Sequence, residues 1–163
     1  MAEFTQVNSS GQELWRTGSA AVSFTPAASS HTALDCVGGA RTLTLPNTAG
    51  RMIRLTGYRF TMPTTTPVTT VWTAYLYNAT PAVIADDAAY VVVLADQAKF
   101  MGTVTIAQVV DFGSTLLESQ GALASNPYIQ MVTDTMTVYL QNITTITTEA
   151  IAHTLTLFYE VQP

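Results

Sequence analysis

The regular alternation of apolar and polar side chains near the end of the chain is the feature that most constrains its fold. Within residues 151–161, Leu155 and Leu157 share one parity, and Thr154 and Thr156 share the other. Alternation with a period of two is typical of a β-strand that buries one face and exposes the other. The pattern therefore predicts a strand that lies against an apolar core.

Comparable signals recur at short intervals along the rest of the chain. The other expected strands are residues 19–24, 32–37, 41–45, 52–62, 68–78, 103–109, 128–133 and 136–141. Between them we expect a helical turn at residues 95–100 and a loop at residues 116–124. Many short strands without a long helix predict an all-β protein with a single domain. We expect a jelly-roll-like antiparallel β-sandwich, with an immunoglobulin-like sandwich as the alternative.

The strand expected at residues 52–62 changes phase in its middle, at Gly57. The large apolar residues on its two sides, which differ in parity, are Ile53, Leu55, Tyr58, Phe60 and Met62. A β-bulge inserts one extra residue and so restores the alternation. We expect a bulge at Gly57 that turns all five side chains toward the core.

The composition of the chain indicates a surface that is wetted by hydroxyl groups rather than by charges. Charged residues make up 10% of the 163 residues, and threonine occurs 28 times. Threonine is β-branched and favours strands. A surface that is poor in charge has few groups that could repel a neighbouring subunit. The cores of protein interfaces are likewise depleted in charge. The composition favours permanent assembly, and a threonine-coated monomer is the alternative.

Several classes of protein are disfavoured by charge and hydropathy. The net charge of −5 and the absence of any lysine or arginine cluster argue against nucleic-acid binding. No apolar stretch approaches the roughly 18 residues of a membrane span, and the N-terminus lacks a signal-peptide pattern. We therefore expect synthesis in a cytoplasm. The single cysteine, Cys36, has no disulfide partner and is expected to be a buried apolar residue.

The residues that could support catalysis are few and scattered. His31 is expected in a serine-rich turn, and His153 is expected as a hydrogen-bonded residue at the edge of the core. No serine lies in a nucleophile elbow, and no glycine-rich phosphate loop is present. We expect a non-enzymatic protein without a cofactor.

Asp86, Asp87 and Asp96 form the only local group of carboxylates. Calcium favours loops rich in oxygen ligands, so these residues are the candidates for a metal site. Their spacing does not fit an EF-hand, and ordinary capping of a loop is the favoured interpretation.

The first 18 residues are polar, with few apolar anchors. We expect residues 1–18 to form an N-terminal arm and residues 19–163 to form the sandwich domain. Phe4, Leu14 and Trp15 are the candidate contacts of this arm, on this subunit or on the next one.

Three tyrosines fall on the parity opposite to the expected core. Tyr75, Tyr77 and Tyr139 are therefore expected to face outward. In an oligomer they are candidate interface anchors, because tyrosine is enriched at binding hot spots. The alternative is that these rings stack on sugars.

Three segments in the middle of the chain carry a family resemblance. These are Val71–Pro81, Ala85–Tyr90 and Leu94–Gly102, which read VWTAYLYNATP, ADDAAY and LADQAKFMG. A strand that ends in Tyr-Asn-Ala-x-Pro, followed by Asp-x-Ala and a short Ala-Asp-x-Ala-Lys-Phe-x-Gly turn, resembles small virion proteins of tailed bacteriophages. The resemblance covers about a fifth of the chain.

This resemblance implies a capsid decoration (cement) protein that binds the major capsid protein on the virion surface and forms a homotrimer. It supplies no catalytic residues. Residues 1–18 would be the clamping arm. A tail-fibre or glycan-binding module is the alternative function.

Overall fold

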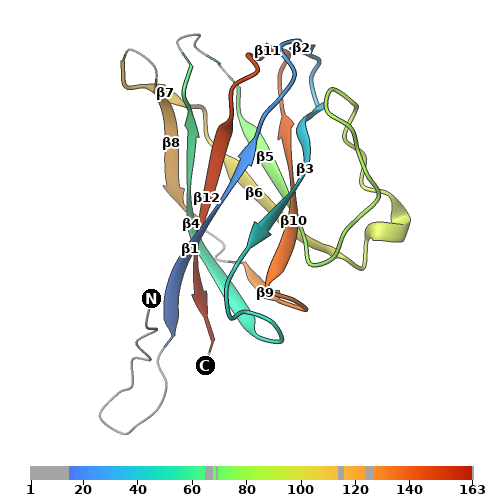
Figure 1. Cartoon of the computed structure of the whole chain (residues 1–163), viewed down its shortest axis with the longest axis vertical. Coiled ribbons are helices and arrows are strands. Elements are labelled where there is room, and N and C mark those ends of the chain that lie inside the picture. The colour runs from blue at the N-terminus through green and yellow to red at the C-terminus, as the bar shows by residue number, and fades with distance from the viewer. Residues whose placement is uncertain (1–14, 65–67, 69, 114–115, 124–126, 163) are drawn as a thin grey trace, which may run out of the picture.

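The chain folds into an all-β sandwich of antiparallel sheets (Figure 1). The computed structural model describes residues 15–64, 68, 70–113, 116–123 and 127–162. Sheet I contains, in spatial order, β1 (Arg16–Phe24), β12 (His153–Val161), β4 (Met52–Met62), β8 (Leu117–Ala122) and β7 (Val110–Asp111), and β9 (Tyr128–Gln130) also pairs with β4. Sheet II contains β3 (Cys36–Thr44), β10 (Thr135–Asn142), β5 (Trp72–Tyr77) and β6 (Phe100–Ile106). The expected antiparallel β-sandwich is confirmed.

A short two-stranded sheet lies at one end of the sandwich, where β2 (Ser30–His31) pairs with β11 (Ile146–Thr147) (Figure 1). A single turn of 3₁₀-helix, η1 (Leu94–Asp96), lies between β5 and β6 and confirms the helical turn expected in this region. These short elements matter for function because both contribute to the anchoring of one long loop.

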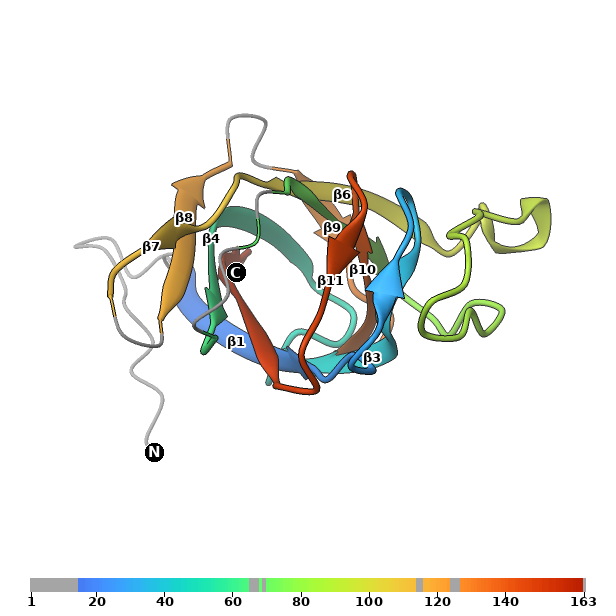
Figure 2. The same ribbon diagram turned by 90° about the horizontal axis from the view of Figure 1, so that it is seen from above.

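The two sheets, which Figure 2 views from one end, enclose one apolar core. In β12 the side chains of Leu155 and Leu157 are fully buried, and Thr154 and Thr156, which have the opposite parity, are partly exposed. The ring of Phe60 on β4 packs against that of Trp72 on β5, with centroids 5.5 Å apart. The alternation in the sequence therefore identified the inner face correctly.

The bulge in β4 is confirmed at the expected glycine. Phe158 of β12 lies opposite Gly57, whereas the next residue, Tyr159, lies opposite Leu55, so Thr56 is the extra residue. All five apolar residues around it are buried. A side chain at Gly57 would place its Cβ 2.9 Å from the backbone oxygen of Gly121 on β8. Glycine is required here because β8 approaches so closely.

Two expectations about strand boundaries in the first third of the chain are wrong. Residues 32–37 and 41–45 do not form separate strands, because the single strand β3 runs from Cys36 to Thr44. Gly38 and Gly39 lie within β3 with φ angles of +75° and +67°. The register of β10 shifts opposite them. The glycine pair therefore marks a bulge rather than the end of a strand.

The loop expected at residues 116–124 is also a correction, because residues 117–122 form strand β8. Its sequence, LESQGA, lacks an apolar alternation. Glu118 is nevertheless accommodated, because Arg59 on β4 donates a hydrogen bond to its carboxylate at 2.6 Å. Cross-strand pairs of this kind stabilise a strand without an apolar pattern.

The boundary of the expected N-terminal arm also differs from the structure. Residues 16–18 belong to β1 and pair with residues 159–161 of β12. Residues 1–14, with Phe4 and Leu14, lie outside the described residues. The sheet therefore begins three residues before the position expected from the sequence.

Candidate functional site

The most distinctive feature outside the sandwich is the segment that connects β5 to β6, residues 78–99, which we call the excursion. It projects from the outer side of sheet II in both views (Figures 1 and 2). Its two ends meet where the amide of Asn78 donates to the carbonyl oxygen of Lys99 at 3.0 Å. A connection of this length that is not a regular helix or strand is often functional.

An aromatic cluster holds the excursion against sheet II. Tyr90 of the excursion packs on Tyr75 of β5, with ring centroids 4.0 Å apart, and on Tyr139 of β10 at 5.6 Å. The hydroxyls of Tyr90 and Tyr77 are hydrogen-bonded to each other. The Tyr139 hydroxyl donates to the carbonyl oxygen of Ala82 at 2.9 Å. The cluster forms a second, smaller core outside the sandwich.

This cluster corrects the sequence-based expectation for the three outward tyrosines. Tyr75, Tyr77 and Tyr139 do point away from the main core, but the excursion covers them. Tyr77 and Tyr139 are 2% and 1% exposed, and Tyr75 is half-buried. Burial raises the pKa of all three hydroxyls and of Tyr90. They therefore remain neutral donors that can pair with the excursion backbone.

Cys36 lies in the same cluster and is fully buried, as expected from the sequence. Burial raises the pKa of its thiol to about 12. The neutral thiol is a weak nucleophile, so Cys36 acts here as a small apolar residue.

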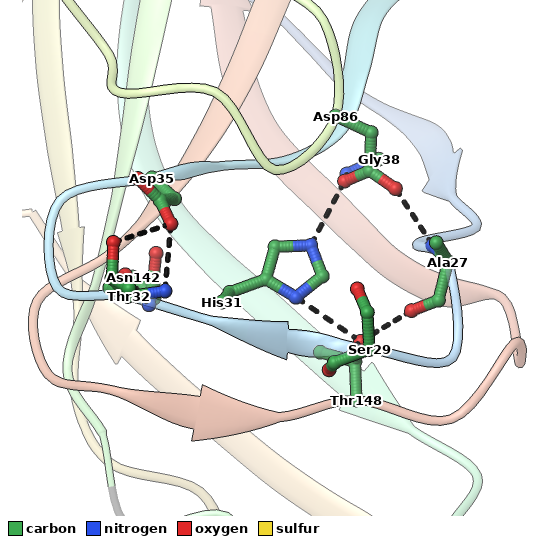
Figure 3. Close-up of polar contacts among 9 residues, drawn as sticks. All are labelled: Ala27, Ser29, His31, Thr32, Asp35, Gly38, Asp86, Asn142 and Thr148. Atoms are coloured by element: carbon green, nitrogen blue, oxygen red, sulfur yellow. Dashed lines mark hydrogen bonds and ion pairs between the residues drawn. The ribbon is translucent and has the colours of Figure 1, made fainter.

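Asp86 is the main polar anchor of the excursion (Figure 3). Its carboxylate accepts hydrogen bonds from the amides of Ala27 and Gly38, each at 2.6 Å, and from His31 Nε2 at 3.0 Å. Burial raises the pKa of Asp86, but these three donors outweigh burial and hold it below the usual range. The ionised carboxylate therefore ties the excursion to β3 and to the β2–β11 end of the sandwich.

His31 connects this anchor to β11. The ring is fully buried, and its Nδ1 lies 3.3 Å from the hydroxyl of Thr148, just after β11 (Figure 3). The expectation that His31 lies in a serine-rich turn is wrong, because the residue belongs to strand β2. The order of hydroxyl, imidazole and carboxylate is that of a catalytic triad. However, Thr148 is 4% exposed and donates to the carbonyl oxygen of Ala27 at 2.6 Å, so the arrangement fastens segments together and offers no accessible nucleophile.

The backbone of the excursion also pairs with the chain just before and within β3. The amide of Tyr90 donates to Leu34, and the amide of Cys36 donates to Ala88, at 2.9 and 2.8 Å. The carboxylate of Asp35 in turn accepts the amide and hydroxyl of Thr32 at 2.6 and 2.7 Å (Figure 3). Sheet II is thus extended sideways by an irregular segment.

Asp96 fixes the other end of the excursion. It is 5% exposed, and its carboxylate accepts hydrogen bonds from the amide of Ala82 at 2.7 Å and from Lys99 Nζ at 2.8 Å. Lys99 Nζ also donates to the carbonyl oxygen of Thr80 at 2.9 Å. The ion pair with Lys99 and the amide of Ala82 lower the pKa of Asp96.

The three aspartates proposed as metal ligands therefore have other roles. Asp86 and Asp96 cap backbone groups at different points of the excursion, and Asp87 is exposed with a φ angle of +63°. Among the residues that the structure describes, no group of three or more metal-ligating side chains comes together. The arrangement agrees with the capping interpretation.

The outer surface of the excursion is apolar. Four consecutive side chains, Val91, Val92, Val93 and Leu94, are 61%, 39%, 41% and 84% exposed, and Val83 is 83% exposed. Sequence reasoning missed this surface, although the uninterrupted run VVVL could have indicated it. Runs of three or four exposed apolar residues destabilise the soluble state of a protein unless they serve a function.

Trp15, the described member of the proposed arm contacts, packs on its own subunit. Its ring lies under the guanidinium of Arg54, with Cζ 5.3 Å from the ring centroid, and forms an edge contact with Tyr128 at 6.3 Å. Arg54 is also paired with Glu160 on β12. Trp15 therefore fixes the start of β1 against sheet I.

No family model matches the sequence, and no curated protein is significantly similar to it. Within the described ranges, no helix is long and apolar enough to cross a membrane.

Proposed function

We propose that the protein is a structural component of a bacteriophage virion, a capsid decoration protein that binds and stabilises the shell of the major capsid protein. The observation that carries this proposal is the apolar run Val91–Leu94, which the excursion presents to solvent. A surface of this kind is typical of a site that binds another protein.

The chemistry of the excursion favours a protein partner over a charged or polar ligand. Of its four charged residues, Asp96 and Lys99 neutralise each other and Asp86 is bonded to His31. The surface of the excursion around Val91–Leu94 is therefore apolar and nearly uncharged. The cores of protein interfaces are also depleted in charge.

The bracing of the excursion also supports a binding role. Tyr90 and Asp86 are held by side chains from β2, β5 and β10, and Asp96 closes the base of the excursion. A segment that is fixed before binding loses little conformational entropy when the complex forms. A run of apolar residues on such a support binds more tightly than the same run on a free loop.

We also propose that the sandwich is a jelly roll. When the short strands are set aside, the eight long strands pair first with last, second with seventh, third with sixth and fourth with fifth. These pairs are β1–β12, β3–β10, β4–β8 and β5–β6. This is the pairing of one long hairpin folded at its middle and wound into two sheets, as in jelly rolls of viral capsid and lectin domains.

The proposal places the protein on the capsid surface, after synthesis in the host cytoplasm, as a homotrimer. The family resemblance supports these assignments, and the low charge of the chain supports lasting contact between subunits. Binding to the assembled shell would stabilise it by mass action.

The test is sedimentation of the purified protein with expanded capsids that lack it. The proposal predicts saturable co-sedimentation and added density on the shell in electron micrographs, with the excursion at the contact. Protein that stays in the supernatant at all concentrations would overturn the proposal.

The alternative, a glycan-binding or tail-fibre module, was motivated by outward tyrosines. Tyr77 and Tyr139 are covered by the excursion, so this motivation no longer applies to them. A glycan array distinguishes the two functions, because a decoration protein gives no signal on it.

A further inference from the structure

We propose that His153 is an acid-sensitive latch, whose protonation opens the end of the sandwich that β2 and β11 close. The two histidines of the chain lie near this end in contrasting environments. His31 has partners on both ring nitrogens. Neither nitrogen of His153 has a hydrogen-bond partner among the described residues, so the expectation of a hydrogen-bonded His153 is wrong. Burying an imidazole without hydrogen-bond partners costs free energy, and it costs more when the ring is protonated.

The surroundings of His153 are apolar and aromatic. The residue is 1% exposed, and its ring lies 6.3 Å from the rings of both Phe60 and Trp72. The indole Nε1 of Trp72 is likewise buried without a partner among the described residues. The side chains of Phe60 and Trp72 offer no carboxylate or carbonyl oxygen to accept a hydrogen bond from an imidazolium, so burial among them favours the neutral ring.

The charged groups that act on His153 do not compensate for burial. Burial is the largest effect and lowers the pKa of His153, Glu149 on the segment before β12 raises it, and His31 on β2 lowers it, so that the pKa lies at about 4. Glu149 is itself engaged by the hydroxyl of Thr64, after β4, at 2.8 Å. The facing residues of β4 and β5, Phe60 and Trp72, carry no charge.

The position of His153 in the sheet makes a local opening the easiest way to hydrate it. His153 is the first residue of β12 and lies opposite Phe24, the last residue of β1, and the pairing of β12 with β4 begins only at Thr154. The preceding strand, β11, has two residues and pairs with β2 alone. Short elements at the end of a sheet open at lower cost than its centre.

Opening would also loosen the excursion, because His31 of β2 holds Asp86 (Figure 3).

The direction of the pH effect on stability follows from the lowered pKa of His153. A folded pKa below the unfolded value of 6.5 means that the unfolded or open state binds the proton more tightly. Stability is therefore complete above pH 6.5 and falls as the pH decreases toward 4.

The first test follows the imidazole resonances of the free protein by NMR between pH 8 and pH 3. The latch predicts that His153 titrates near pH 4, or titrates together with the loss of native signals from the β2–β11 end. Titration near 6.5 with every native signal retained would overturn the latch. This measurement needs no variant and is independent of capsid binding.

The second test compares the wild type with His153→Leu by denaturant unfolding. Between pH 7.5 and pH 5, the folding equilibrium constant of the wild type should fall about 30-fold relative to that of the variant. An equal response of both proteins would contradict the latch.

Hydrogen exchange at pH 7.5 and pH 5, corrected for intrinsic rates, locates the opening. Protection should decrease first at residues 146–153 and in the excursion and remain high in the centre of β10. A uniform loss across both sheets would contradict a local opening, even if the stability change had the expected size.

Discussion

His31 and Asp86 lie 55 positions apart in the chain, yet a hydrogen bond of 3.0 Å joins Nε2 of the buried imidazole to the carboxylate. This contact connects the β2–β11 end of the sandwich to the excursion. The same carboxylate also accepts two backbone amides. One side chain therefore fixes the excursion to three points within residues 27–38.

Replacement of Asp86 should weaken this junction. In Asp86→Asn one carboxylate oxygen becomes an NH2 donor and the negative charge is lost, so at least one of the three donors loses its acceptor and the others keep only a neutral one. We expect a loss of about 1–3 kcal/mol in the free energy of unfolding, measured with denaturant at pH 7. Asp87→Asn is the matched control, because Asp87 is exposed and asparagine tolerates its positive φ. A loss of the same size in both variants would contradict the role of Asp86.

Acid should remove the contribution of a second carboxylate, Asp134. One oxygen of Asp134 accepts the amides of Thr48 and Ala49, both at 2.7 Å, and these bonds lower its pKa from 3.8. A lowered pKa means that the stabilisation is complete above pH 4 or so and is lost as the pH falls through the folded pKa.

The expected result is that Asp134→Asn is less stable than the wild type at pH 6, and that the difference shrinks below about pH 4. Unfolding by denaturant at a series of pH values measures it. A difference that stays constant down to pH 2 would show that the carboxylate charge of Asp134 does not matter.

Tyr139→Phe should loosen the excursion without disturbing the main core. The hydroxyl of Tyr139 donates to Ala82 and accepts the amide of Ile84 at 3.2 Å, and phenylalanine keeps the ring but leaves both backbone groups unpaired. We expect a loss of about 1–3 kcal/mol in unfolding free energy. Faster hydrogen exchange at Ile84 is also expected, with no change in β12. Unchanged exchange at Ile84 would be inconsistent with this contact.

The inner faces of the strands were predictable from the sequence because burial in a sandwich follows the two-residue period. Leu155 and Leu157 in β12 and the bulge at Gly57 all followed from parity. β8 was not predictable, because Glu118 is stabilised by Arg59 of another strand, and such a pair leaves no local pattern.

Parity also identified the outer face of sheet II but not what covers it. Tyr77 and Tyr139 point away from the core as expected, and only the three-dimensional course of residues 78–99 buries them. The partnership of His31 with Asp86 depends on the same course. The alternation of apolar and polar residues cannot predict contacts between a loop and a strand that is distant in the sequence.

Co-sedimentation of Leu94→Asp with expanded capsids shows whether the apolar run of the excursion binds a protein shell. Leu94 is 84% exposed, so the variant should fold with nearly unchanged stability. Val132→Asp is the control, because Val132 is 64% exposed and lies outside the excursion. We predict that Leu94→Asp weakens binding by about tenfold or more, and that Val132→Asp binds like the wild type. Wild-type binding by Leu94→Asp would contradict the account.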